Sequence, residues 1–405
     1  MLACKHIVLS AVTWALYCSA ADAQLKIQRV ANFGYPNEGR LRFTGGREVE
    51  FADDETKIIT AFYGSTVQLF DLKKNESIGE PIRTSGDGEV GFVNNEIAYT
   101  ADWESVRLWD AKSGQQIGNE IPHELREDTI IHPAISPDGT YIATRATMMS
   151  VQLWDVSTRK LIGKQRKYSN EVHSIQFTDD GGLLIVRSGG SLYAIDSGTG
   201  DDVAGPFESG WRFNHFPKHH ILVTTEQVQE GPYQLVIRST DQKSWPVTHR
   251  SNLPGKLKRI VALNDNQILL QTSKNDYTPA MFIISLDKPT TRIEVESNAD
   301  RAFGLIVPQD KRHWICSNIR NISCQKFGES KPVWQKQIPP SGYDQHLYPL
   351  NNEYFIIRDK QENFGIYKIA DGSEVWTQAG VKRFNMTKNK IAICSSDGVE
   401  IWEME

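Results

Sequence analysis

Residues 136–163 read SPDGTYIATRATMMSVQLWDVSTRKLIG, and this stretch decides the fold. Its first four residues form a turn, because proline fixes φ, aspartate caps the local backbone and glycine tolerates a positive φ. Residues 141–146 and 151–154 follow as strands, since β-branched and aromatic residues alternate or run on over strand length. A second turn at 157–159 leads into a fourth strand. The stretch predicts a four-stranded antiparallel unit, which needs neighbours like itself to bury both faces.

Two markers in the stretch carry a resemblance to a known family. They are Ser136-Pro137-Asp138-Gly139 and Val151-Gln152-Leu153-Trp154-Asp155, which resemble the WD-repeat β-propeller family, particularly its bacterial members. The resemblance implies a hydrogen-bond tetrad, and the positions that suit it are His123, Ser150 and Trp154. The aspartate expected before Ser150 is absent, because Met148 and Met149 stand there. We therefore expect packing, rather than an intact tetrad, to make this unit rigid.

The same unit recurs along the chain. Strands like the WD-like strand at 151–155 recur at 66–71, 106–110 and 192–196, and weaker units follow at 221–239, 267–286, 313–327 and 354–369. Val333-Trp334 and Val375-Trp376 are similar to outer strands of the quinoprotein type of propeller repeat. The last unit, 381–402, has only three strands, and residues 25–30 can supply the fourth. We predict an all-β fold, one β-propeller of nine four-stranded blades (eight being the alternative), closed by the N-terminal strand.

The N-terminus is typical of a signal peptide. Lys5 and His6 precede an apolar run at 7–20, and Ala21-Asp22-Ala23 fits a cleavage site. The run is too short to span a membrane, and no later run is longer. We predict a signal peptide at 1–23, a propeller at 24–405, no membrane span and a periplasmic or secreted location. The formal net charge of −5 gives no reason to expect nucleic acid as a partner.

Cleavage after residue 23 would leave three cysteines: Cys316, Cys324 and Cys394. Cys316 and Cys324 fall in consecutive strands, and a three-residue loop at 319–321 would set them directly opposite each other. Opposite residues of a hairpin approach the distance that a disulfide needs, so we predict this bond. A one-residue bulge would instead pair Cys316 with Ser323 and turn the sulfurs apart. Cys394 is expected to be a buried thiol.

Basic residues recur at the start of the innermost strands. When these strands are aligned on VHSIQF (172–177), the second position is basic or histidine in six of nine units: Arg47, His173, Arg212, Lys258, His346 and Lys382. Glu89 is the one carboxylate in this column. Because innermost strands begin at one mouth of a propeller, the six side chains would form a positive ring there. Solvated strand ends are the alternative explanation.

Apolar residues occupy turns between the second and third strands of three consecutive units. They are Tyr63, Trp103, Met148 and Met149, at positions that usually hold aspartate, glycine or asparagine. Clustered exposed aromatic residues and methionines suit a protein-binding patch. Packing onto neighbouring loops is the alternative.

No nucleophile, phosphate-loop or zinc-hydrolase motif occurs in the sequence, and no pair of carboxylates stands out for acid–base chemistry. His215, His219 and His220 straddle a turn without cysteine or carboxylate at ligand spacing, so we expect no metal and no cofactor. The resemblance implies a non-catalytic, monomeric scaffold that binds a protein, a peptide or an anionic envelope ligand through its top face. The alternative is a lactonase-like or quinoprotein-like propeller enzyme.

Overall fold

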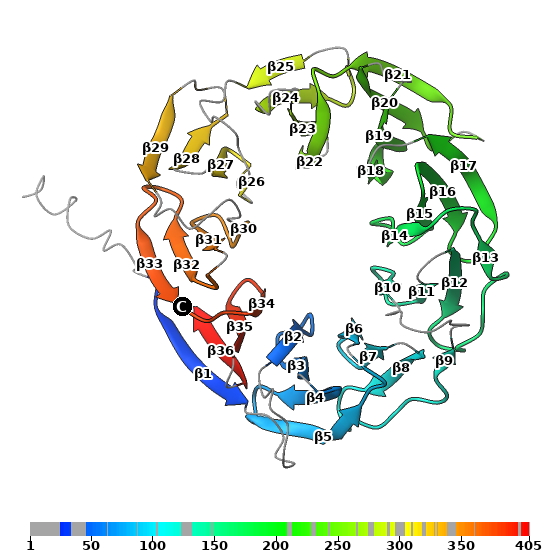
Figure 1. Cartoon of the computed structure of the whole chain (residues 1–405), viewed down its shortest axis with the longest axis vertical. Helices are drawn as coiled ribbons and strands as arrows, with labels where there is room; N and C mark the ends of the chain where they lie inside the picture. The colour runs from blue at the N-terminus through cyan, green and yellow to red at the C-terminus, as the bar shows by residue number, and fades with distance from the viewer. Residues whose placement is uncertain are drawn as a thin grey trace, which may run out of the picture.

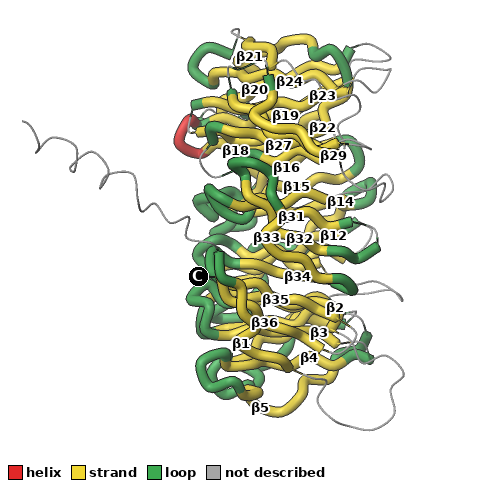
Figure 2. The backbone as a smooth tube through the Cα atoms, turned by 90° about the vertical axis from the view of Figure 1, so that its left-hand side faces the viewer, coloured by secondary structure: helices red, strands yellow, loops and turns green. Residues whose placement is uncertain are grey.

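The computed structural model describes residues 25–33, 46–62, 64–86, 88–102, 104–122, 132–146, 149–208, 213–227, 232–241, 244–264, 266–273, 279–289, 292–295, 304–308, 311–317, 321–327, 329, 331–337, 346–359, 361–395 and 398–404. Their strands form nine four-stranded sheets that follow one another around a ring (Figure 1). Within the described residues the one helix is η1 (Pro217–His219), which Figure 2 shows in red. The predicted all-β propeller and the count of nine blades are confirmed, and the alternative of eight is wrong.

The first three blades follow β1 (Ile27–Phe33) in chain order. Blade 1 contains β2 (Gly46–Phe51), β3 (Lys57–Phe62), β4 (Thr66–Asp71) and β5 (Glu76–Arg83). Blade 2 contains β6 (Glu89–Asn94), β7 (Ile97–Ala101), β8 (Ser105–Asp110) and β9 (Ile121–Pro122). Blade 3, on the stretch quoted first, contains β10 (His132–Ile135), β11 (Tyr141–Ala146), β12 (Ser150–Asp155) and β13 (Arg166–Lys167). Each blade pairs its strands in order, with the first innermost in the ring (Figure 1).

The middle blades continue the pattern. Blade 4 contains β14 (Val172–Phe177), β15 (Leu183–Ser188), β16 (Ser191–Asp196) and β17 (Asp202–Glu208). Blade 5 contains β18 (Phe213–Phe216), β19 (Ile221–Gln227), β20 (Tyr233–Ser239) and β21 (Val247–Asn252). Blade 6 contains β22 (Lys256–Asn264), β23 (Gln267–Ser273), β24 (Pro279–Ser285) and β25 (Arg292–Val295).

The last blades complete the ring. Blade 7 contains β26 (Gly304–Ile306), β27 (His313–Ser317), β28 (Asn321–Lys326) and β29 (Pro332–Gln337). Blade 8 contains β30 (His346–Pro349), β31 (Tyr354–Arg358), β32 (Phe364–Lys368) and β33 (Glu374–Gln378). Blade 9 contains β34 (Arg383–Met386), β35 (Lys390–Ser395) and β36 (Gly398–Met404), and its outermost strand is β1 (Ile27–Phe33).

The N-terminal strand closes the ring, as predicted. β1 pairs antiparallel with β36, from Ile27 opposite Met404 to Phe33 opposite Val399. Figure 1 shows the blue β1 beside the red β36. This pairing joins the two ends of the described chain in one sheet and removes the open edge that a three-stranded last blade would leave.

The hydrophobic core lies between neighbouring blades rather than at one centre. Phe33 and Ile401 of blade 9 pack with Val49 and Phe62 of blade 1. Trp109 contributes in the same way between blades 1 and 2, and Trp154 between blades 2 and 3. Every blade thus buries both of its faces against neighbours, which is why the isolated unit cannot fold alone.

The tryptophans use the second strand of their own blade as a hydrogen-bond partner. Trp109 Nε1 donates to Thr100 Oγ1 at 3.0 Å, and Trp154 Nε1 donates to Thr144 Oγ1 at 3.4 Å. Ser150, expected beside Trp154 in the tetrad, instead accepts from Gln165 Nε2 at 3.4 Å. The expected tetrad position of Ser150 is therefore wrong, and Thr144 accepts the hydrogen bond from the Trp154 indole instead.

The predicted disulfide is wrong, because the hairpin register differs by one residue. Cys316 lies opposite Ser323, and Cys324 lies opposite Ile315. Since successive residues of a strand point to opposite faces, the two sulfurs are on different sides of blade 7. Cys316 packs with the cluster toward blade 6 and Cys324 with the cluster toward blade 8. No disulfide joins the three cysteines that the structure describes.

Candidate functional site: the top face

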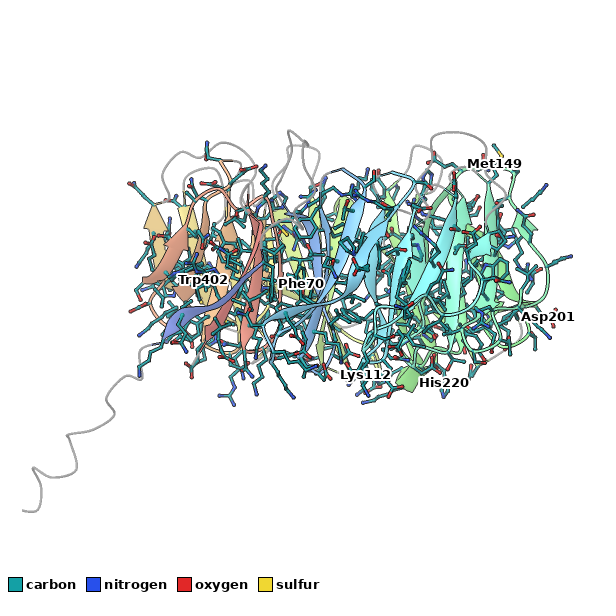
Figure 3. All side chains as sticks on the ribbon, turned by 90° about the horizontal axis from the view of Figure 1, so that it is seen from below. Phe70, Lys112, Met149, Asp201, His220 and Trp402 are labelled. Carbon is teal, nitrogen blue, oxygen red and sulfur yellow. The ribbon has the colours of Figure 1, made fainter. Side chains whose placement is uncertain are left out.

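We call the face on which the nine innermost strands begin the top face. Because the strands of a blade alternate in direction, the turn between its second and third strands also lies there. Figure 3 shows Met149, in such a turn, on the upper side of the ring, and Lys112 and His220, which follow third and first strands, on the lower side. The described positions of the predicted basic ring and Met149 of the predicted apolar turns therefore belong to one face.

Five of the six predicted basic positions are described, and all five lie at the start of an innermost strand. Arg47, His173 and Lys258 each occupy a register shift, between Gly46 and Glu48, Val172 and Ser174, and Leu257 and Arg259. His346 begins β30, and Lys382 precedes β34 by one residue. Arg212 lies outside the described residues. A bulge leaves its extra residue out of the ladder and redirects its side chain, so the bulges separate these three side chains from the regular sheet.

The five side chains differ in their surroundings. Lys258 and His346 are exposed, and the His346 ring lies 6.4 Å from that of Tyr348. His173 Nδ1 is 4.0 Å from Glu171 Oε2, and its side chain is 26% exposed. Arg47 is 22% exposed, lies 3.9 Å from Glu48 Oε2 and donates to the carbonyl of Gly88. Arg47 is thus also part of the contact between blades 1 and 2.

Other arginines, which the sequence pattern did not single out, also donate to a backbone carbonyl of the next blade. Arg145 Nη1 donates to Val172 O at 2.8 Å, and Arg358 Nη2 donates to Lys382 O at 2.8 Å. Arg259 donates to the carbonyl of Leu305. Each of these carbonyls lies at or just before the innermost strand of the next blade. Guanidinium groups therefore join neighbouring blades along the top face, and a basic residue at the start of a first strand or the end of a second strand is the signal that could have found them.

Carboxylates interrupt the basic ring on one side. Glu48 and Glu50 lie on β2, and Glu89 begins β6. Burial and then the charge of Glu89 raise the pKa of Glu48. Burial and then the charge of Glu48 raise the pKa of Glu50 to about 7. Blades 1 and 2 therefore form a sector in which carboxylates accompany Arg47, whereas Lys258, His346 and Lys382 lie on blades 6, 8 and 9. The alternation Glu48-Val49-Glu50-Phe51 was the signal for this sector in the sequence.

Of the predicted apolar turn residues, only Met149 is described. Tyr63, Trp103 and Met148 lie outside the described residues. Met149 is 49% exposed, and its carbonyl accepts a hydrogen bond from the Tyr168 N–H at 2.7 Å. Met149 is therefore an exposed apolar side chain on a turn that is tied to the neighbouring segment.

Two of the histidines considered for metal binding contact side chains outside their own group. His215 stacks on Trp245 with ring centroids 6.2 Å apart, and His219 Nδ1 is 3.9 Å from Asp287 Oδ1. In the part of the chain that the structure describes, no three histidine, cysteine or carboxylate side chains are arranged to hold a metal ion. The described residues also include no helix long and apolar enough to cross a membrane.

The architecture defines a β-propeller, and comparisons with known proteins agree. Transcription initiation factor TFIID subunit 5 of Caenorhabditis elegans is 30% identical over 128 residues, which are 29% of this chain and 19% of that protein. WD repeat-containing protein 62 of Mus musculus is 24% identical over 144 residues, 36% of this chain and 9% of that protein. The matches thus span less than a fifth of either relative. No protein-family model matches the chain.

A solved structure supports the fold independently. The crystal structure of a eukaryotic initiation factor superposes with a TM-score of 0.63 at 12% identity, over 89% of this chain and 96% of that one. At this identity the likeness concerns the fold alone. The chain is a nine-bladed β-propeller with WD-repeat relatives, which confirms the predicted resemblance to WD-repeat propellers.

Proposed function

We propose that this propeller is a protein-interaction scaffold that holds its partner on the top face. Its relatives support this, since one is named as a subunit of a larger initiation factor. The ring offers a stable platform, because both ends of the described chain are paired in one blade and neighbouring blades are joined by arginines. Such a platform binds by presenting surface residues, without chemistry of its own.

Met149 is the observation that carries this proposal. Turns of this kind usually hold small polar residues, yet this one exposes 49% of a methionine. Methionine adapts to irregular apolar surfaces and is enriched in protein interfaces. The backbone beneath it is held by the hydrogen bond from Tyr168, so little order would have to be gained on binding.

Two finer features belong to the same proposal. The basic arc of blades 6, 8 and 9, with Lys258, His346 and Lys382, would receive an anionic group of the partner or an anionic envelope ligand. The segment at 1–23 would export the chain to the periplasm or the medium, where a monomer would meet that partner. Charge complementarity of this kind chiefly speeds association and selects the partner.

The test uses protein beginning at Gln24 as bait, with cross-linking to extracts of the envelope and of the cytosol. Met149→Lys places a charge on the proposed interface, and we expect recovery of the cross-linked partner to fall about fivefold or more, as for loss of an interface contact worth ~1 kcal/mol. Leu161→Lys is the matched control, since Leu161 is 37% exposed and follows β12 on the opposite face of the same blade. Equal recovery by the two variants would place the interface elsewhere, and a partner found only in cytosol would contradict export.

A further inference from the structure

The ring closes between blades 9 and 1, and polar side chains join these blades at their inner strands. Asn385 Nδ2 on β34 donates to Glu50 Oε2 on β2 at 2.6 Å. Beside these strands, Lys390 Nζ at the start of β35 lies 3.7 Å from Glu55 Oε2 in the turn after β2. Blade 1 is the first blade that the chain completes and blade 9 the last, so these contacts hold together segments distant in sequence.

Glu50 is part of a group of carboxylates that extends into blade 2. Glu48 and Glu50 are two residues apart on β2, so their side chains share one side of the strand. Glu48 receives a backbone hydrogen bond from Val90 of blade 2, while Glu50 receives the one from Asn385 of blade 9. The two glutamates thus tie blade 1 to both of its neighbours. Because both are partly buried, the mutual repulsion of their charges is screened less than between fully exposed charges.

Other titratable groups lie near Glu48 and Glu50 on β2 itself and on the strands beside it. On β34, Arg383 attracts the charge of Glu48, and on β2 itself Arg47 does the same. On β6 and β7, Glu89 and Tyr99 face the pair, and burial raises the pKa of Tyr99, which stays neutral.

The remaining neighbours of β2 are neutral or engaged elsewhere. On β35, burial raises the pKa of Cys394 to about 12, and Lys390 is engaged by Glu55 and Glu403. On β36, Glu400 is paired with Arg29, and on β3 Lys57 lies near Asp54.

We propose that Glu50, at the junction between blades 9 and 1, is a proton-sensitive group of the ring, at which uptake of a proton relieves the repulsion with Glu48 and stabilises the closed fold. The hydrogen bond from Asn385 favours the charged carboxylate, but burial and the charge of Glu48 oppose that charge more strongly. Burial and the neighbouring charge of Glu48 raise the pKa of Glu50 to about 7, whereas the unfolded chain would release this proton near 4.3. Between these two values the folded protein holds a proton that the unfolded chain has lost. The stabilisation is therefore complete in acid below the unfolded value and is lost as the pH rises through about 7.

The experiment compares melting temperatures of the whole chain at about pH 5.5 and about pH 8, at constant ionic strength. We expect the wild-type melting temperature to fall by several degrees over this range. Glu50→Gln cannot ionise, so its fall should be clearly smaller, and it should melt above wild type at the higher pH. Glu353→Gln, at an exposed turn of blade 8, should keep the wild-type fall. A wild-type fall that Glu50→Gln leaves unchanged would overturn the proposal.

A second variant and a local measurement keep the proposal testable if Glu50→Gln fails to fold. Asn385→Asp adds a carboxylate opposite Glu50, so its melting temperature should fall more steeply with pH than that of wild type. Hydrogen exchange, corrected for the intrinsic pH effect, should show protection of β2 and β34 falling with rising pH, ahead of blades 4 to 6. A normal pH response of Asn385→Asp, or loss of protection that is uniform around the ring, would also overturn it.

Discussion

Single aspartates build the repeated lower turns of this molecule. Asp71, Asp110, Asp155 and Asp196 each end a third strand, and each accepts a hydrogen bond from a backbone N–H two or three residues later. Bonds from Ser113 hold the pKa of Asp110 below its usual value, and bonds from Thr158 do the same for Asp155. The aspartate at the end of each WD-like strand therefore stabilises the turn that follows. This explains why the aspartate recurs in these blades, without any role in ligand binding.

The three described cysteines should be unreactive free thiols in the native protein. Cys316, Cys324 and Cys394 are 2%, 0% and 0% exposed, and burial raises the pKa of Cys316 to about 11. Thiolates are the reactive form, so a thiol reagent at neutral pH should react very slowly with the native protein. Denatured, unreduced protein beginning at Gln24 should then show all three thiols. A count of one would restore the disulfide between Cys316 and Cys324.

The outermost strands determine how much of each blade's outer edge is left unpaired. The outer strands β9 and β13 have only two residues each, and the isolated bridges Trp109 to Gln116 and Trp154 to Leu161 extend the pairing of β8 and β12. Blade 9 uses the N-terminal strand β1 for the same purpose, and Ala31 and Phe33 of that strand belong to the core shared with blade 1. β1 thus supplies both a hydrogen-bonded edge and buried apolar surface.

Deleting residues 24–31 should therefore lower the melting temperature by about 5 °C or more, because the loss of a strand exposes the edge of β36 together with apolar core. Val30→Lys is the control, since Val30 is 42% exposed and sits at the register shift between Arg29 and Ala31. That variant should change the free energy of unfolding by only about 0.5 kcal/mol. Thermal unfolding followed by circular dichroism makes the comparison, and an unchanged melt of the deletion would show that β1 contributes little.

The whole molecule carries an uneven charge that its composition conceals. The formal net charge is −5, yet the top face combines a sector with carboxylates on blades 1 and 2 with a basic arc on blades 6, 8 and 9. Radial repetition brings these residues to one face although they are far apart in the sequence. The face is therefore able to orient a partner whose own charges are unevenly distributed.

Binding of a labelled hexaglutamate peptide checks the basic arc. Lys258→Glu should weaken it about threefold or more at low salt, because one exposed charge pair contributes up to ~1 kcal/mol. Lys288→Glu is the matched control, since Lys288 is an exposed lysine of the same blade that follows β24 on the opposite face. Wild-type affinity should fall as salt rises, since exposed charges are screened over about 10 Å at 0.1 M. Equal effects of the two variants would refute a site on the top face.

The sequence by itself determined the repeat, the number of blades and the closing strand, because turn residues and strand periodicity are local signals that recur nine times. It also placed Arg47, His173, Lys258, His346 and Lys382 at strand starts, since position within a repeat implies position in the ring. Only the tertiary structure decided the one-residue register that separates Cys316 from Cys324, and the meeting of Glu50 with Asn385 across the junction. Strand register and the contacts between blades depend on how whole sheets pack against each other. The packing energy comes from residues of several segments, so no single segment of the sequence predicts it.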